Sequence, residues 1–202
     1  MALSPMMEHY LSMKEKYKDC VLFYRLGDFY EMFFDDAVRV SKLLDLTLTG
    51  RDCGLKERAP MCGIPFHAAD AYIAKLVSMG ERVAICEQLT EPTAGKGMVE
   101  RDVIRVVSAG TVIEENQLDE KKNNYIACAY KSGAAYALAW ADITTGELCA
   151  EELSGRENVI SALVNLAVAE VICKGNALRR KGGRRGEPRR ASRVLVLSAV
   201  GV

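Results

Sequence analysis

Apolar residues recur along this chain at two spacings, which predict helices that alternate with strands. Met6, Tyr10, Met13 and Tyr17 repeat at i, i+4, i+7 and i+11, the spacing of one helix face. Short apolar runs between glycines, prolines or charges indicate buried strands instead. The pattern predicts helices over residues 4–17, 35–44 and 67–79, and strands over 20–25, 29–31, 47–49, 82–89 and 103–107. Such interleaving favours an α/β fold with a mixed sheet for the first part of the chain.

Two stretches of this first part show no regular repeat. Residues 50–60 are charged and are expected to form a loop. Residues 60–66 are a short apolar passage held between two prolines, with a predicted turn at 63–65 flanked by Met61 and His67.

The second half of the chain has a different pattern. Three β-rich runs, 124–130, 134–143 and 147–153, are separated by glycines, which predicts an antiparallel meander. A helix over 155–169 and a strand over 171–173 come next. This βββαβ order is the opening of a ribonuclease-H-like layout, although it is short for a complete one.

The segment that begins at Gly27 carries the most specific chemistry. Phe29 and Glu31 stand two residues apart, so in an extended strand they project from one face, roughly 6.6 Å apart. Tyr30 and Met32 then point the other way, toward a core. A ring beside a hydrogen-bonding group can wedge into a base stack and touch a base edge. On spacing alone, the better expectation is that the aromatic residues of this segment are core residues and Glu31 a solvated charge.

Charge is distributed unevenly along the chain. Residues 1–112 hold 14 basic and 16 acidic residues, 113–173 hold 4 and 10, and 174–202 hold 9 and 1. The first two parts are therefore not nucleic-acid binders by bulk charge, and any DNA contact there depends on local geometry or on other parts of a larger assembly. The last part is basic, glycine-rich and without periodicity, and is expected to be an irregular tail.

Cysteine usage and hydropathy exclude several classes of protein. None of the seven cysteines forms a C-x-x-C pair, and Cys20, Cys62, Cys86, Cys128 and Cys149 lie in apolar runs, which predicts buried thiols in a reducing compartment. With only two histidines and no ligand spacing, no metal site is expected. No apolar run reaches 18 residues and the N-terminus has no signal-peptide pattern, so neither a membrane span nor secretion is expected.

Four strings in one order carry a family resemblance. They are FYRLGDFYE (23–31), PMCGIPFH (60–67), AICEQ (84–88) and VERDVIR (99–105). With them, the chain resembles the N-terminal part of the MutS family of bacterial DNA mismatch-recognition proteins. The resemblance implies a mismatch-binding domain at 1–112, a linker at 113–123, a partial ribonuclease-H-like connector domain at 124–173 and a basic tail at 174–202.

The resemblance also implies a mechanism and partners. Phe29 stacks on a mispaired base from the minor-groove side and Glu31 hydrogen-bonds the base, either protonated as a donor or as a charge that penalises well-paired DNA. The partners are double-stranded DNA with mispaired or unpaired bases and, through the connector, a MutL-type repair protein, in the bacterial cytoplasm at the nucleoid. Candidate contacts to the DNA backbone are Arg51, Lys56, Arg58, Met61, His67 and Arg105.

Two of these candidates have open alternatives. His67 is as suitable for a helix cap as for a phosphate. Arg105 shares a strand face with Arg101 only if their strand is regular, and a structural ion pair is the better expectation for one of the two.

The chain departs from the family after its connector-like part. Members continue into a clamp and an ATPase that uses ATP and Mg²⁺, but no G-x-x-x-x-G-K-[ST] occurs here, so neither a cofactor nor enzymatic activity is expected in this chain. The likeness stops after Leu178, and we expect the tail to be a frameshifted or truncated end. Two alternatives are a ribonuclease-H-like nuclease fragment using Asp142, and an interaction fragment that no longer binds DNA.

Overall fold

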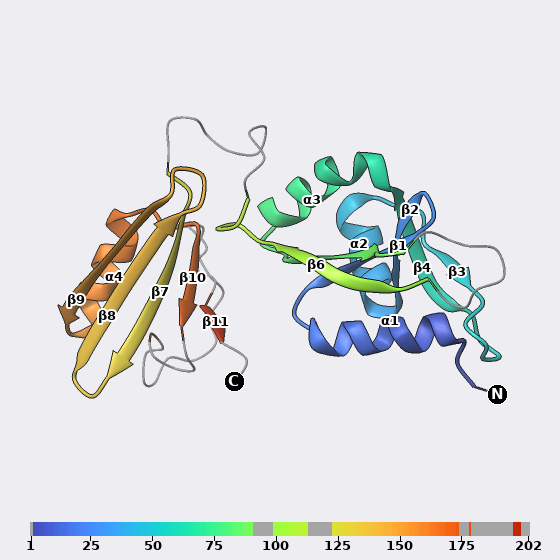
Figure 1. Cartoon of the computed structure of the whole chain (residues 1–202), viewed down its shortest axis with the longest axis horizontal. Helices are drawn as coiled ribbons and strands as arrows, with labels where there is room; N and C mark the ends of the chain where they lie inside the picture. Colours follow the sequence, from blue (N-terminus) through green and yellow to red (C-terminus); the bar gives the residue numbers. More distant parts are fainter. Residues whose placement is uncertain (1, 91–98, 113–122, 174–177, 179–195, 199–202) are drawn as a thin grey trace. The chain divides into compact units, whose positions relative to one another are not determined.

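The computed structural model describes residues 2–90, 99–112, 123–173, 178 and 196–198 (Figure 1). The chain divides into two compact units, unit 1 (1–108) and unit 2 (109–202). Each unit has its own sheet with parallel and antiparallel neighbours, which confirms the predicted α/β class with mixed sheets. The predicted linker at 113–123 lies almost wholly outside the described residues, as does most of the predicted tail.

Unit 1 is built on a six-stranded sheet in the order β3-β4-β2-β1-β5-β6. Only the β1–β5 pair is parallel; the other neighbours are antiparallel. Its elements are α1 (Pro5–Lys16), β1 (Val21–Leu26), β2 (Phe29–Phe33), α2 (Phe34–Leu44), β3 (Thr49–Arg51), β4 (Ala59–Pro65), the 3₁₀ turn η1 (Phe66–Ala68), α3 (Ala69–Ser78), β5 (Val83–Gln88) and β6 (Arg101–Val107).

Helices cover both faces of this sheet (Figure 1). Of the predicted stripe of α1, Tyr10 and Met13 are buried against one face, which includes Tyr24 and Phe33. Met6 and Tyr17 are only partly buried, and Met7 is the fully buried methionine of the first turn. On the other face α2 packs on β2 and β4, and α3 packs on β5. Tyr30 and Met32 are buried there, 6% and 0% exposed, as the alternation of the strand predicts.

Polar contacts are buried where β2 separates from β1. The pairing of the two strands ends at Tyr24 and Glu31, so Phe33 lacks a ladder partner on that side. The Tyr10 hydroxyl replaces that partner, since it accepts from Phe33 N–H at 3.2 Å and donates to Phe33 C=O at 3.3 Å. Asp36 does the same for β1 by accepting from Leu22 N–H at 3.0 Å, and its other oxygen binds Lys14 at 2.9 Å. These contacts end β2 after five residues and hold α1 against the sheet.

One expectation for unit 1 was wrong and another holds in part. The predicted turn at 63–65 lies inside β4, opposite β2. The predicted charged loop at 50–60 is confined to residues 52–58, because its two ends belong to β3 and β4, which form an antiparallel pair. The β6 strand is also irregular, since its register against β5 shifts between Ile85 and Cys86 and leaves Ile104 without an opposite residue. This bulge reverses the alternation of side chains, so Arg101 and Arg105 lie on opposite faces of the sheet.

Unit 2 contains the predicted antiparallel meander. Its sheet has the order β11-β10-β7-β8-β9, with β10 parallel to β7. The elements are β7 (Tyr125–Ser132), β8 (Ala135–Asp142), β9 (Glu147–Ser154), α4 (Arg156–Asn165), β10 (Glu170–Cys173) and β11 (Val196–Ser198). The predicted helix over 155–169 ends earlier, at Asn165. None of the helices in the part of the chain that the structure describes is long and apolar enough to cross a bilayer.

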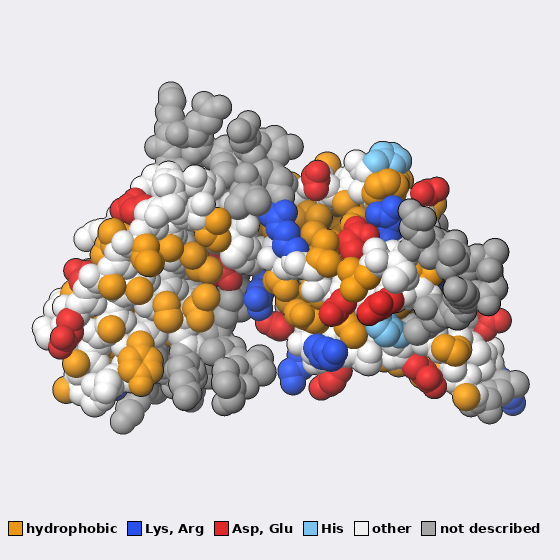
Figure 2. All heavy atoms as spheres, viewed as in Figure 1, with side chains coloured by type: hydrophobic (Ala, Val, Ile, Leu, Met, Phe, Trp, Pro, Cys, Tyr) orange, Lys and Arg blue, Asp and Glu red, His pale blue; other side chains and the backbone are white. Residues whose placement is uncertain are grey.

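Helix α4 covers only one face of this sheet. Ala127, Tyr136 and Leu138 are buried beneath it with Val159 and Leu163 of the helix. Figure 2 shows hydrophobic side chains gathered over β7, β8 and β9 on the opposite face, where Tyr130 and Leu148 are exposed.

Two cysteines of unit 2 are more exposed than the sequence predicted. Cys128 lies on the uncovered face and is exposed, and Cys149 is half-buried, so the expectation that both are buried was wrong. Cys20, Cys62 and Cys86 are buried as expected, and burial raises the pKa of the Cys62 thiol to about 11.

Asp142 closes the turn between β8 and β9. One carboxylate oxygen accepts from the Thr144 amide at 2.8 Å and hydroxyl at 2.6 Å, and the other accepts from Asn124 N–H at 2.9 Å. Burial disfavours the charged form, but these hydrogen bonds outweigh it and hold the pKa of Asp142 below its ordinary value.

We expect Tyr10→Phe to destabilise unit 1 by about 1–3 kcal/mol, because it leaves both main-chain groups of Phe33 without their buried partner. Amide hydrogen exchange in β1 and β2 measures the effect. Tyr17→Phe is the control, since Tyr17 is a partly buried tyrosine of the same cluster whose hydroxyl has no recorded partner among the described residues. Equal protection in the two variants would contradict this role of Tyr10.

The carboxylate of Asp142 is expected to make the stability of unit 2 depend on pH. Because its pKa is lowered in the folded state, its contribution is present above the unfolded value of about 3.9 and is lost as the pH falls below it. Asp142→Asn should cost about 1–3 kcal/mol at neutral pH and flatten the acid limb. Urea unfolding followed by Trp140 fluorescence, from about pH 7 to pH 3, tests this, with the exposed Glu151→Gln as control. An unchanged acid limb in Asp142→Asn would refute it.

Candidate nucleic-acid interface

Phe29 lies at the tip of the β1–β2 hairpin. Its side chain is 45% exposed, whereas Tyr30 and Phe33 of the same strand are 6% and 1% exposed. The hairpin pairs Leu26 with Phe29, so Gly27 and Asp28 form the turn, and Gly27 adopts the positive φ of 58° that a residue with a side chain rarely takes. The spacing alone favoured a core position for Phe29, and the structure places it on the surface.

The turn beside Phe29 is held by three hydrogen bonds, one from Arg25 of the same hairpin and two from residues distant in sequence. Gly27 N–H donates to Gln88 Oε1 at 3.1 Å, and Gly27 C=O accepts from Arg25 Nε at 2.5 Å. Asp28 C=O accepts from Phe66 N–H at 2.9 Å. An exposed hairpin tip usually leaves such groups to water, so this turn is unusually constrained for its position.

Two arginines complete the support of the hairpin. Arg25 places its guanidinium 3.6 Å from the centroid of the Phe66 ring and 3.5 Å from Glu87. Arg101 donates to Arg25 C=O at 2.8 Å, to Val99 C=O at 2.9 Å and to Gln88 Oε1 at 3.3 Å. Arg101 is thus a structural residue, held by carbonyl and amide oxygens.

Glu31 lies on the same sheet face as Phe29 and is paired with Arg51. Arg51 Nη1 is 2.5 Å from Glu31 Oε2, and the two side chains are 38% and 13% exposed. Gly63 stands opposite Glu31 on β4. A Cβ at Gly63 would lie 3.5 Å from Glu31 Cγ and 4.0 Å from Phe29 Cδ1, so a glycine there leaves both side chains uncovered. The structure therefore brings together the predicted residues Phe29, Glu31 and Arg51.

The other backbone candidates lie around this face with different surroundings. Lys56 and Arg58 are exposed between β3 and β4, and neither has a recorded partner within the described residues. Met61 is half-buried against the core and its Sδ accepts from the Thr49 hydroxyl. His67 is exposed in η1 with its ring against Phe66, and no side-chain cap is recorded for η1 or α3.

Arg105 is far from this group in the sheet. It lies on β6, with β1 and β5 between its strand and β2. The bulge at Ile104 also turns it to the face opposite Phe29 and Glu31. The sheet therefore does not bring Arg105 together with the other candidates.

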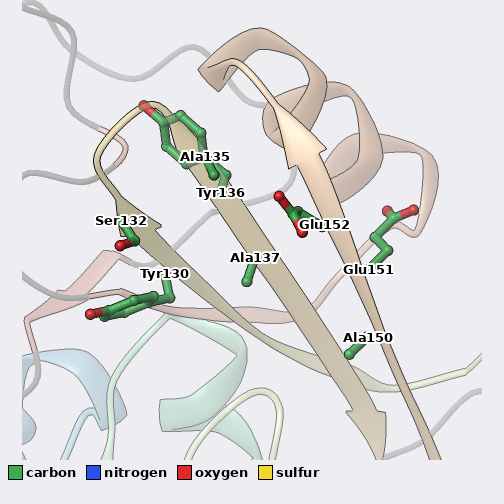
Figure 3. Close-up of a pocket in the computed structure, with 8 residues that line it drawn as sticks. All are labelled: Tyr130, Ser132, Ala135, Tyr136, Ala137, Ala150, Glu151 and Glu152. Carbon is green, nitrogen blue, oxygen red and sulfur yellow. The ribbon is translucent and has the colours of Figure 1, made fainter.

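Unit 2 offers no comparable constellation in its described residues. The recorded partners of Asp142 are Thr144 in the turn and the Asn124 amide before β7, and no group of three or more potential metal ligands occurs in the described part of the chain. The uncovered sheet face has a hollow of about 480 Å³ whose floor includes Ala135, Ala137 and Ala150, beside Tyr130 and Glu152 (Figure 3). This geometry favours neither nuclease chemistry nor a phosphate contact.

Sequence reasoning missed the residues that support the hairpin, namely Arg25, Gln88 and Phe66. All three stand inside the strings that carried the family resemblance, but those strings alone assign them no role. The parallel pairing of β1 with β5 brings Gln88 to the turn from a distance of 61 residues, which no local pattern indicates.

Models of known protein families match both units. A family model described as MutS domain I matches residues 4–116, and one described as MutS domain II matches residues 124–193. The second match continues past Cys173, where the partial connector domain was expected to end.

Curated relatives match most of the chain. The protein "DNA mismatch repair protein MutS" of Acetivibrio thermocellus is 60% identical over 153 residues, covering 76% of this chain and 18% of that protein. Its namesake in Ruminiclostridium cellulolyticum is 61% identical over 152 residues, covering 75% and 17%. The one in Clostridioides difficile is 53% identical over 170 residues, covering 84% and 18%. The chain thus spans less than a fifth of the length of these relatives.

Gln88→Leu is expected to loosen the hairpin tip, because Gly27 N–H loses its acceptor. One hydrogen bond of about 1 kcal/mol corresponds to roughly fivefold faster exchange of the Gly27 amide. Amide exchange measured by NMR tests this, and Gln88→Glu is the matched control because it keeps an acceptor oxygen in place. If the Gly27 amide exchanges equally in all three proteins, Gln88 does not hold the turn.

Proposed function

Since this chain belongs to the MutS family, we propose that unit 1 binds double-stranded DNA at mispaired or unpaired bases, in the manner of a DNA mismatch repair protein. The observation that carries the proposal is the exposed ring of Phe29 at a hairpin tip. The main chain of this tip is hydrogen-bonded to Arg25, Gln88 and Phe66. A duplex wedge needs both properties, because the ring must reach the bases and must not fold back when it meets them.

Energy favours such a wedge at mispaired steps. Inserting an apolar side chain between base pairs costs a few kcal/mol of unstacking. Stacking a base on an aromatic ring returns about 1–3 kcal/mol. Because a mispaired step is already poorly stacked and paired, its unstacking cost is lower. For Phe29, the free energy gained by stacking would then roughly equal the unstacking cost at a mispaired step and fall short of it in paired DNA. This preference does not depend on the base sequence.

Glu31 supplies the second part of the proposed recognition. Its carboxylate projects from the same face as the ring, so a base displaced by Phe29 meets it directly. A carboxylate in a DNA groove is repelled by phosphates unless a hydrogen bond to the base compensates. Glu31 therefore disfavours paired DNA, which offers no displaced base.

Unit 1 carries no net positive charge that would add sequence-independent affinity for DNA. Unit 1 is slightly acidic, and the clamp that encircles DNA in the family lies outside the matched residues. We propose weak binding, micromolar at best, in the bacterial cytoplasm where duplex DNA is available. Contact of unit 2 with a MutL-type repair partner stays a prediction, and binding rather than catalysis is the activity that this site supports.

Phe29→Ala is expected to abolish the preference for mismatched DNA, with a loss of about 1–3 kcal/mol on the mismatched duplex. Band-shift assays with G·T and matched duplexes at low salt measure it. Ile104→Ala is the matched control, since Ile104 is an exposed apolar residue on the far edge of the same sheet. Glu31→Gln should keep or strengthen binding but narrow the gap between the two duplexes.

A chain of residues 1–173 serves as a second control in that assay. The nine basic residues beyond position 173 can bind any nucleic acid by counterion release and so mask a preference. If Phe29→Ala retained the preference of the parent chain, the wedge mechanism would be wrong.

A further inference from the structure

The ion pair between Glu31 and Arg51 indicates a role for Arg51 other than the phosphate contact that the sequence suggested. Arg51 was a candidate for a phosphate contact, yet its guanidinium is engaged with Glu31. We propose that the two residues enter the DNA groove as one neutral unit, so that Arg51 does not contact phosphate and instead determines how Glu31 discriminates between bases. This inference rests on the proposed function of unit 1.

Burial favours retention of the pair on DNA. The Glu31 side chain is only 13% exposed, and in the described part of the chain its carboxylate has no recorded partner other than Arg51. If Arg51 moved to a phosphate, it would leave a largely desolvated carboxylate without a counter-charge, beside other negative charges. Docked DNA would also exclude water from the pair, which strengthens the attraction between its members.

Geometry keeps the pair within reach of a displaced base. Arg51 comes from β3 and Glu31 from β2, on either side of β4. Since Gly63 is the β4 residue opposite Glu31, no side chain at that position stands over the carboxylate. Arg51 binds Oε2, so Oε1 is the carboxylate oxygen that has no recorded partner in the described part of the chain.

A carboxylate held in this way acts as a hydrogen-bond acceptor. Paired A·T steps present only acceptors to the minor groove, and these oppose Glu31, whereas a paired G·C step adds one guanine amino donor. A mispaired base exposes ring or amino N–H groups that have lost their partner, and these suit an acceptor. Arg51 thus makes the site selective for bases that offer an unsatisfied donor, in place of the protonated, donating Glu31 that the sequence left open.

Salt dependence on the matched duplex separates the two roles of Arg51. Each cation that neutralises a phosphate steepens the plot of log K against log salt by about 0.9. Replacing the pair by neutral residues, in Glu31→Gln with Arg51→Met, should leave the slope of the full-length chain unchanged. Glu31→Gln alone should steepen it by up to about 0.9, because Arg51 is then free to meet a phosphate.

Lys42, exposed on α2 on the other side of the sheet from Phe29, offers a control of equal net charge. Glu31→Gln combined with Lys42→Met also removes one charge of each sign, but it leaves Arg51 free. Its slope should therefore exceed that of the Glu31→Gln, Arg51→Met chain. If the Glu31→Gln, Arg51→Met chain instead shows a slope lower than the parent by about 0.9, Arg51 contacts phosphate and the proposal is wrong.

The ratio of affinities for mismatched and matched duplex gives the second readout. Arg51→Met should weaken binding to both duplexes, roughly tenfold for a loss of about 1.4 kcal/mol, because it leaves Glu31 uncompensated. Arg51→Lys keeps a cation and should retain most of the affinity. Equal affinities for Arg51→Met and the parent would overturn the proposal.

Failure of the wedge itself has a different signature. If the parent chain and Phe29→Ala show the same ratio, the proposed function fails. The salt slopes on matched DNA still report whether Arg51 is held by Glu31.

Discussion

The position of Phe29 depends on the buried polar contacts where β2 leaves β1. Two adjacent strands that separate inside a core expose main-chain groups that water cannot reach, and each such group costs free energy if unpaired. Tyr10 and Asp36 satisfy these groups from α1 and α2, and Lys14 neutralises Asp36. The strand that carries Phe29 is therefore fixed at its inner end by two helices. Its outer end, with Phe29, is exposed to solvent.

The outer end is constrained in another way. The hairpin turn is held by Arg25 of its own strand β1 and by contacts from β5 and η1. A ring fixed before binding loses less conformational entropy when it inserts, which leaves more of the stacking energy for discrimination. Exposure of an apolar ring is unfavourable in the free protein, so its support by Arg25, Gln88 and Phe66 is consistent with a binding role rather than with packing.

In both units, the charged side chains near the proposed site and the turns are satisfied by neighbouring residues. Glu31 is paired with Arg51 at the proposed site, and Arg101 is engaged by oxygens beneath the hairpin. In unit 2, Asp142 is used by its turn, and the sheet face opposite α4 presents alanines with Tyr130 and Leu148. The recognition that we propose for unit 1 therefore depends on shape and on a few paired charges, not on a basic surface.

The alternation of apolar residues was enough to predict most helices and strands, the two mixed α/β parts and the shared face of Phe29 and Glu31, because each of these depends on residues close in sequence. It failed for β3 and β4, which are defined by pairing with each other across a charged loop and by the pairing of β4 with β2. It failed again at Ile104, where a bulge that separates Arg101 from Arg105 has no local signal. The exposure of Phe29, its support by Gln88 and the pairing of Glu31 with Arg51 were decided only by the tertiary structure, since they depend on which strands lie side by side and on where a glycine leaves a face open.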